Sequence, residues 1–318
     1  MTRDEGRVVR VPPSPEAIRL DRFVVSGGFV RTRSHAKALI DAGRILVDGR
    51  ACKAGFLLHG GETIEIREDE QPARSPEPED IPLSILYLDD DVAAVDKPAG
   101  LVVHPAPGAW RGTLVNAVLF HRLVGGARET ERPGIVHRLD KETSGVLLIA
   151  RNPAAHEALA RQFHDRIVEK TYFAFVLGTP ALRAGVTEWS VGRHPRERQR
   201  MSVRSRRGRA ARTAWEVVES FGNVSWLRLR PETGRTHQIR VHLAAMGHPV
   251  VGDPLYGARR GRALPAEGPA RDFGRLALHA TAIAFDHPTR GERMRIEAPI
   301  PFDMANLLEE MRSKRKSR

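Results

Sequence analysis

The sequence predicts an α+β protein with a mixed, mainly antiparallel central sheet flanked by helices, preceded by a small N-terminal α/β domain. Three observations predict this class. Segments with strand character outnumber segments with helical periodicity. Many neighbouring strands are separated by turns too short for the crossovers that parallel strands need. A charged, proline-containing stretch at residues 68–82 has the composition of a linker between two domains.

Residues 1–16 are expected to form a flexible tail, because they are charged and show no periodic apolar pattern. Residues 17–67 are expected to form the first domain. Short helices are predicted near residues 18–24 and 34–42, the second ended by Gly43. The Asp-Gly pair at 48–49 predicts a hairpin because it accepts the positive φ angles of a tight turn, and residues 61–66 predict the last strand.

The second domain is expected to span residues 83–302. Strands are predicted at 85–88 and 92–95 around an acidic turn. Thr113 can cap a helix that runs through His121, and Asn152 followed by Pro153 is a typical helix start. Further strands are predicted at 169–178, 215–218 and 226–230, then a helix ended by Gly247.

The last strands are predicted at 276–280, 283–285 and 294–298. Residues 303–318 are expected to form a C-terminal helix, which Asp303 can cap, and a basic tail from Ser313 to Arg318. The N-terminal residues lack the pattern of a secretory signal, and no apolar run approaches the roughly 18 residues that span a bilayer. We therefore expect a cytoplasmic protein.

The formal net charge of +12 indicates a polyanionic partner, because neutralising phosphates drives nucleic-acid affinity. An ordinary solvated surface would also explain the charge, so its distribution matters. Nine arginines lie between Arg193 and Arg212, among turn-forming glycine and proline residues. This density predicts a projecting hairpin or loop that contacts RNA phosphates, or a solvated loop that orders on RNA.

One residue stands out as a catalytic candidate. Asp140 lies in a polar segment next to Arg138, immediately before the strongly apolar stretch 146–150. A loop held by a rigid strand is a common place for catalysis. Taken alone, however, an aspartate in this setting is also compatible with a turn cap or an ion pair with Arg138.

A family resemblance favours catalysis. The string His-Arg-Leu-Asp at 137–140, followed by Thr-Ser-Gly at 143–145, resembles the active-site signature of the RluA-type pseudouridine synthases. Three further blocks are similar and in the same order: residues 96–105, residues 169–178, and residues 232–257 with Gly-Arg-Thr-His-Gln at 234–238. The resemblance covers nearly all of residues 18–301 and implies the pseudouridine synthase fold.

Residues 17–67 resemble the small RNA-binding domain first known from a small-subunit ribosomal protein, the S-four-type domain. The similar segments are Leu-Asp-Arg at 20–22, residues 33–40 and residues 43–49. In such domains the second helix and the hairpin present basic side chains to RNA. The resemblance therefore implies RNA contacts by basic residues that otherwise form an ordinary charged face, namely Arg31, Arg33, Lys37, Arg44 and Arg50.

The resemblance also implies roles in the isomerisation of uridine. Asp140 acts at the sugar, as nucleophile or as base, and the residues leave that choice open. Tyr172 packs against the uracil and assists proton removal. Arg235 pairs with the aspartate and keeps it charged. Leu278 or Leu276 lines the pocket.

Two residues beside the aspartate are candidates for substrate contact. Arg138 is expected to fill the space left by a flipped base or to hold a phosphate, and His137 to contact the substrate as well. The chemistry requires no cofactor, donor or metal, and none is expected. With one cysteine in the chain, an internal disulfide or a multi-thiolate metal site is excluded. We expect a monomer.

The N-terminal domain and the string Gly-Arg-His-Pro at 192–195 look most like those of family members that modify large-subunit ribosomal RNA, which is the predicted substrate. A transfer-RNA-directed synthase and a non-catalytic RNA-binding assembly factor are the alternatives. A metal-dependent hydrolase using His137, Asp140 and His156 is disfavoured because a third compact ligand cluster is missing. A methyltransferase would need a glycine-rich nucleotide loop, which the sequence lacks.

Overall fold

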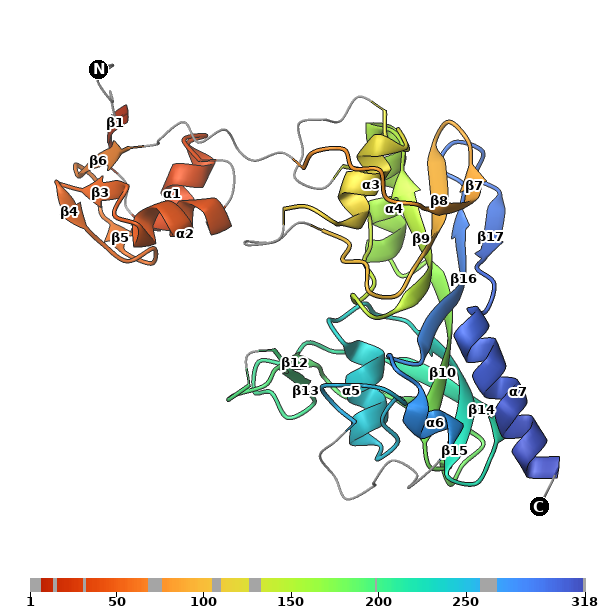
Figure 1. Cartoon of the computed structure of the whole chain (residues 1–318). Helices are drawn as coiled ribbons and strands as arrows, with labels where there is room; N and C mark the ends of the chain where they lie inside the picture. The colour runs from red at the N-terminus through yellow and green to blue at the C-terminus, as the bar shows by residue number, and fades with distance from the viewer. Residues whose placement is uncertain are drawn as a thin grey trace. The chain divides into compact units, whose positions relative to one another are not determined.

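The computed structural model describes residues 7–13, 16–30, 33–67, 76–104, 110–125, 133–197, 199–257 and 268–316. The chain divides into two compact units, Met1–Arg74 and Ser75–Arg318 (Figure 1). None of the helices in the described ranges is long and apolar enough to cross a membrane.

The first unit is a small α/β domain. Its four-stranded sheet has the order β1-β6-β3-β4, and β2 pairs with β5. The predicted hairpin is confirmed, because Asp48 and Gly49 have φ angles of 48° and 74° between β3 and β4. The elements are β1 (Arg7–Arg10), β2 (Ile18–Arg19), α1 (Leu20–Ser26), α2 (Arg33–Asp41), β3 (Ile45–Val47), β4 (Arg50–Ala51), β5 (Leu57–Leu58) and β6 (Thr63–Ile66).

The predicted flexible tail is wrong for residues 7–11. β1 pairs antiparallel with β6, from Arg7 opposite Ile66 to Arg10 opposite Thr63, and Val11 is buried in the core of the domain. A four-residue strand with two central valines is too short to give a periodic signal, so the pairing partner decides its structure. Residues 1–6 and 14–15 of the expected tail lie outside the described residues.

The second unit is organised around a nine-stranded sheet with the order β11-β14-β15-β10-β16-β9-β8-β7, and β17 pairs with β16. Within the described residues, β9 and β16 pair in parallel and the other strand pairs of this sheet are antiparallel, as predicted. The strands of the sheet are β7 (Ser84–Leu88), β8 (Val92–Lys97), β9 (Ser144–Ala150), β10 (Glu169–Leu177), β11 (Ala184–Thr187), β14 (Thr213–Ser220), β15 (Val224–Pro231), β16 (Leu278–Asp286) and β17 (Arg293–Glu297). The strands β12 (Gly192–Arg193) and β13 (Met201–Ser202) pair with each other in a separate two-stranded sheet.

The helices of this unit form where capping residues predict them. Asn152 accepts a hydrogen bond from the backbone N–H of Ala155, and Thr113 forms a capping box with Asn116. Figure 1 shows α5 and α7 on opposite sides of the part of the sheet that holds β10, β14 and β15. The helices are α3 (Leu114–Phe120), α4 (Pro153–His164), α5 (Gln238–Ala245), α6 (Pro269–Asp272) and α7 (Phe302–Lys316).

Three predicted boundaries are wrong. Of the expected linker, residues 68–75 lie outside the described residues, but 76–82 pack on the second unit: the side-chain amide of Asn116 donates to the carbonyl of Glu77 at 2.7 Å. α7 buries Met304, Leu307 and Met311 in the core of the same unit and continues to Lys316, where a basic tail was expected. The predicted strands 276–280 and 283–285 are parts of one strand, β16, which begins two residues later than predicted.

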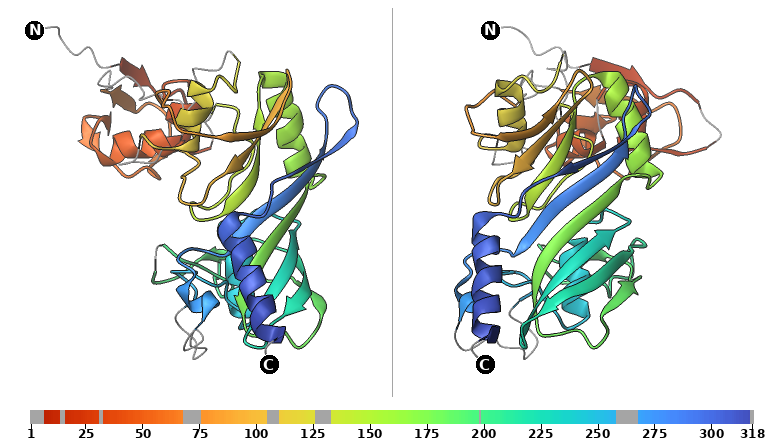
Figure 2. Two further views of the ribbon diagram at one scale, coloured as in Figure 1. Left: turned by 45° about the vertical axis from the view of Figure 1, so that its right-hand side comes forward. Right: turned by 90° about the vertical axis from the view of Figure 1, so that its right-hand side faces the viewer.

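Two hydrophobic cores lie along this sheet. The first core surrounds β8, β9, α3 and α4, and the second surrounds β15, α5 and α7. The long, twisted strands β10 and β16 run through both cores (Figure 2). The sheet is therefore continuous although the hydrophobic interior is divided.

The two parts of the sheet meet at a short junction, where β9 pairs with β16 through His279 opposite Ser144 and Ala280 opposite Gly145. Gly145 has a φ of 115°, and a Cβ there would lie 2.2 Å from the carbonyl oxygen of Ala280. Only glycine allows the strands to approach this closely. The junction lies four residues after Asp140 in the chain.

Candidate active site

The loop that carries Asp140 is fixed on both sides of that residue. Leu139 is 5% exposed and packs in the first core. The carbonyl oxygen of Lys141 accepts a hydrogen bond from the backbone N–H of Gly100 at 2.9 Å, and the N–H of Thr143 donates to the carbonyl of Asp140 at 3.1 Å. The carboxylate itself keeps 19% of its side-chain surface exposed. Asp140 is thus an accessible acid on a rigid support.

Lys97, at the end of β8, organises this loop from within. Its side chain is fully buried, and its Nζ lies 2.8 Å from the carbonyl oxygens of Pro98 and Leu101 and 3.0 Å from that of Lys141. An ammonium has three protons to donate, which matches these three acceptors. Burial lowers the pKa of Lys97 to about 8, against the attraction of nearby acidic residues. Lys97 therefore joins the segment around Gly100 to the Asp140 loop.

Arg240, on α5, is the guanidinium that pairs with Asp140. Its Nη1 lies 3.0 Å from Oδ2 of Asp140. Its Nε and Nη2 lie 2.8 and 2.9 Å from the two carboxylate oxygens of Asp253, whose side chain is fully buried. Asp253 also accepts hydrogen bonds from the backbone N–H groups of Leu255 and Tyr256. These contacts raise the pKa of Arg240 further above its ordinary value, in spite of its burial.

The expectation that Arg235 pairs with Asp140 is wrong. α5 begins at Gln238, so Arg240 lies in its first turn and is held against Asp253, whereas Arg235 lies in the preceding turn. The Nε of Arg235 donates to the carbonyl of Ala210 at 3.3 Å. The segment 234–240 contains both arginines, and the sequence signal that separates them is the start of the helix together with the buried acid at 253.

His237 borders the same carboxylate. Its Nε2 lies 4.0 Å from Oδ2 of Asp140, and its Nδ1 lies 3.0 Å from the hydroxyl of Tyr256. That hydroxyl accepts a hydrogen bond from the backbone N–H of Met201 at 2.8 Å, which leaves its own proton to donate to Nδ1. Burial lowers the pKa of His237 against the opposing effect of Asp140. We infer a neutral imidazole with its proton on Nε2, facing Asp140.

Tyr172 lies where the two cores meet. It packs against residues of both cores, and the pairing of β10 with β16 shifts its register between Thr171 and Tyr172. Such an irregularity re-aims a strand side chain. Burial, and next the charge of Asp140, raise the pKa of the Tyr172 phenol. The phenol is therefore protonated at neutral pH, within the electrostatic reach of Asp140.

His137 has a structural position, which contradicts the expected substrate contact. Its Nε2 accepts a hydrogen bond from the backbone N–H of Leu148 at 2.8 Å, and its ring stacks on Phe163 with 4.8 Å between centroids. Burial lowers the pKa of His137 to about 3, so the ring is neutral. It anchors the segment before Asp140 on β9 and α4.

The other two predicted neighbours differ in exposure. Arg138 is exposed, and its side chain forms no hydrogen bond or ion pair with other residues that the structure describes. Its charge contributes to the lowered pKa of His237, which places it beside the site. Leu278 is 3% exposed and packs in the second core, opposite Ala174 of β10.

The basic residues predicted in the first unit lie on and after α2. Arg33 pairs with Asp21 at 2.7 Å, and Lys37 pairs with Asp41 one turn later in the helix. Both cations keep 61% of their side-chain surface exposed. Arg44 follows α2 and is half-buried, and Arg31 lies outside the described residues. Arg33 and Lys37 are therefore accessible from solvent.

The first part of the arginine-rich segment 193–212 lies in a short antiparallel hairpin of β12 and β13, which agrees with the predicted hairpin for that part. Arg198 lies outside the described residues. The hairpin adjoins the Asp140 site, because the N–H of Met201 donates to the Tyr256 hydroxyl. Among the described residues, no group of three or more His, Cys, Asp or Glu side chains is arranged to hold a metal ion.

Comparisons with known proteins identify the family of the chain. A family model described as RNA pseudouridylate synthase matches residues 91–245, and the S4 domain model matches residues 18–64. The Ribosomal large subunit pseudouridine synthase D of Xanthomonas campestris is 42% identical over 306 residues, covering 95% of this chain and 91% of that protein. An uncharacterized RNA pseudouridine synthase of Chlorobaculum parvum is 43% identical over 310 residues, covering 93% and 94%.

A solved structure supports the fold as well. Human RNA Pseudouridylate Synthase Domain Containing 4 superposes with a TM-score of 0.58 at 26% identity, covering 72% of this chain and 93% of that chain. Identity above 40% over most of both sequences is shared with the bacterial relatives. The chain therefore belongs to the RluA-type RNA pseudouridine synthases, isomerases of uridine in RNA, and carries an N-terminal S4 domain.

Proposed function

We propose that this enzyme converts uridine to pseudouridine in large-subunit ribosomal RNA. The observation that carries the proposal is the similarity, over nearly the whole length of both chains, to proteins named Ribosomal large subunit pseudouridine synthase D from several bacteria. Both the S4 domain and the synthase domain lie within the similar region. Such an enzyme would work where ribosomal RNA is made, in the cytoplasm.

Asp140 acts at the ribose of the target uridine. The reaction breaks the bond between C1′ and N1 of the base, rotates the uracil and forms a bond between C1′ and C5; the proton on C5 is then lost and N1 is protonated. Asp140 serves as the nucleophile at C1′ or as the base at the neighbouring carbon. Arg240 keeps the carboxylate charged, and its position is held by Asp253.

Tyr172 packs against the uracil and takes part in the proton transfer from C5. Support comes from its location at the meeting of the two cores and from the effect of the Asp140 charge on its pKa. Arg138, exposed beside Asp140, fills the space left by the flipped nucleotide or binds a phosphate. Arg33, Lys37 and Arg44 bind RNA phosphates from the S4 domain.

The test is incubation of the enzyme with ribosomal RNA and transfer RNA transcripts, followed by mapping of pseudouridine. The Asp140→Asn variant, which keeps the size of the side chain, serves as the blank. Pseudouridine in large-subunit RNA with the wild type alone is the expected result. Modification of transfer RNA alone would assign the enzyme to that substrate. No pseudouridine with either protein would indicate a binding factor, and equal amounts with both would contradict the role of Asp140.

A further inference from the structure

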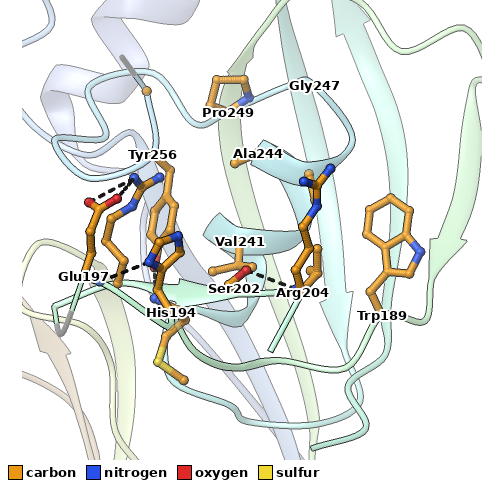
Figure 3. Close-up of a pocket in the computed structure, with 15 residues that line it drawn as sticks. Trp189, His194, Glu197, Ser202, Arg204, Val241, Ala244, Gly247, Pro249 and Tyr256 are labelled. Atoms are coloured by element: carbon orange, nitrogen blue, oxygen red, sulfur yellow. Dashed lines mark hydrogen bonds and ion pairs between the residues drawn. The ribbon is translucent and has the colours of Figure 1, made fainter. Parts of the chain in front are cut away.

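A cavity lies next to the Asp140 site, between α5 and the β12–β13 hairpin. Its volume is about 680 Å³, within the range of roughly 300 to 1,000 Å³ that is typical of pockets for small molecules. The helix contributes an apolar floor that includes Val241 and Ala244 (Figure 3). Asp140 is not among the residues that line it. The reaction described above leaves this cavity unused.

Two aromatic rings line opposite sides of the cavity in Figure 3. Trp189 is 43% exposed. Its backbone is fixed, because its carbonyl oxygen accepts a hydrogen bond from Nε2 of His242 at 2.8 Å. Tyr256 is almost fully buried. The guanidinium groups of Arg200 and Arg240 each lie over its ring, 5.2 Å from the centroid. A large aromatic ring that stays exposed on a fixed backbone is typical of a stacking surface for a planar ligand.

Polar groups of both signs complete the lining. The Nη1 of Arg200 lies 3.2 Å from both carboxylate oxygens of Glu197. The Nε of Arg200 is buried and has no hydrogen-bond partner among the described residues. Ser202 and Arg204 contribute a hydroxyl and a second, exposed guanidinium. Hydrogen-bond donors and acceptors between two aromatic rings suit the edge of a nucleobase. The surrounding arginines suit the phosphate of the same nucleotide.

We infer that this cavity binds one unpaired nucleotide of the substrate RNA, distinct from the target uridine. The inference rests on the proposed function. The nucleotide enters beside the active site, because Tyr256 forms the wall of the cavity and hydrogen-bonds His237, which borders Asp140. Its base stacks on Trp189, and Glu197 and Arg200 read its edge. The enzyme then selects its site by a second base near the target uridine.

A direct binding experiment tests the cavity without turnover. Tryptophan fluorescence is titrated with AMP and UMP, and with ribose 5-phosphate and inorganic phosphate as ligands without a base. We expect saturable quenching by the nucleotides alone, its loss in Trp189→Phe and its retention in Trp110→Phe, because Trp110 is similarly exposed but does not line the cavity. Equal quenching by phosphate, no quenching, or quenching that persists in Trp189→Phe overturns the inference.

A kinetic experiment tests the same cavity on RNA. Each nucleotide near the mapped uridine is replaced in turn by an abasic residue, and kcat/KM is measured. At one position the loss of the base should lower kcat/KM by about 5- to 100-fold in the wild type, as expected for a stacked base. This loss should nearly vanish in Trp189→Ala, and in Ala244→Leu, which narrows the cavity from its floor. Trp110→Ala should behave like the wild type.

The outcomes separate this inference from the proposed function. If pseudouridine is found only in another class of RNA, the substrate assignment fails, while the fluorescence titration still decides the cavity. If ribosomal RNA is modified but every abasic position affects Trp189→Ala and the wild type equally, the cavity assignment fails alone. Melting temperatures of the variants close to that of the wild type show that each comparison concerns folded protein.

Discussion

The double salt bridge of Arg240 allows its proposed catalytic role to be separated from its structural role. In Arg240→Met, the carboxylate of Asp253 stays fully buried without its charged partner. Removing one partner of a buried ion pair destabilises a protein by about 3–5 kcal/mol, a large part of the roughly 5–15 kcal/mol that holds a typical domain folded. The same change removes the cation 3.0 Å from Asp140. Loss of one such electrostatic partner lowers turnover by about 10²- to 10³-fold.

The double variant Arg240→Met, Asp253→Asn distinguishes the two effects. Because no buried charge is left unpaired, we expect most of the lost stability to return, to within about 1–2 kcal/mol of the wild type. The catalytic defect should remain. Asp253→Asn alone should keep activity within about tenfold, since the contact of Arg240 with Asp140 is still present.

Two measurements check this reasoning. Urea denaturation gives the free energy of unfolding of the three variants, and single-turnover pseudouridine formation gives the rate of the chemical step. Wild-type turnover in the double variant would refute the view that Arg240 supports the charge of Asp140. Equal stability of the single and double variants would refute the view that the buried carboxylate of Asp253 causes the destabilisation.

Three further predictions concern other parts of the chain. Lysine in the unfolded chain keeps its proton up to its ordinary pKa of 10.5, whereas folded Lys97 loses it near pH 8. The unfolded state therefore binds more protons between these values, and the free energy of unfolding should gain about 3 kcal/mol from this group as pH rises through them. Urea denaturation of Lys97→Met should lack that gain. The same pH dependence in Lys97→Met and the wild type would contradict the effect assigned to burial. Tyr172→Phe should bind RNA normally but lose about 10²- to 10⁴-fold in the chemical step if the hydroxyl transfers a proton, and single-turnover rates near those of the wild type would limit the residue to packing. Replacing Lys37 and Arg44 by Gln should weaken RNA binding and make the slope of log K against log salt less steep by about one for each RNA phosphate that the variant no longer neutralises; an unaltered slope would remove these residues from the interface.

Much of the fold can be predicted from the sequence because its signals are local. The capping groups Thr113 and Asn152 begin helices where expected, and the Asp-Gly turn at 48–49 joins two strands. The position of the candidate active-site loop is likewise indicated by a contiguous motif around Asp140. Each of these features depends on residues a few positions apart, so a single sequence is enough to read them.

The features that the sequence did not predict depend on contacts between distant segments. Arg240 and Arg235 have the same chemistry, and Asp253 together with the start of α5 determines which one reaches Asp140. His137 looks like a ligand in the motif, but its partner is the backbone of Leu148 in the next strand. β1 becomes a strand because β6 offers a free edge. Long-range pairing decided these cases, and one sequence without its fold does not reveal it.

The division of the interior into two cores has a consequence for the folding of the enzyme. Asp140 is anchored through Leu139 in one core, and Arg240 through its helix in the other. A half-folded molecule, with one core consolidated and the other still open, would hold an acid without its counter-ion and would be inert toward RNA. Recovery of turnover during refolding should therefore trail the slower of the two consolidation steps, which makes catalysis itself a reporter of completed assembly.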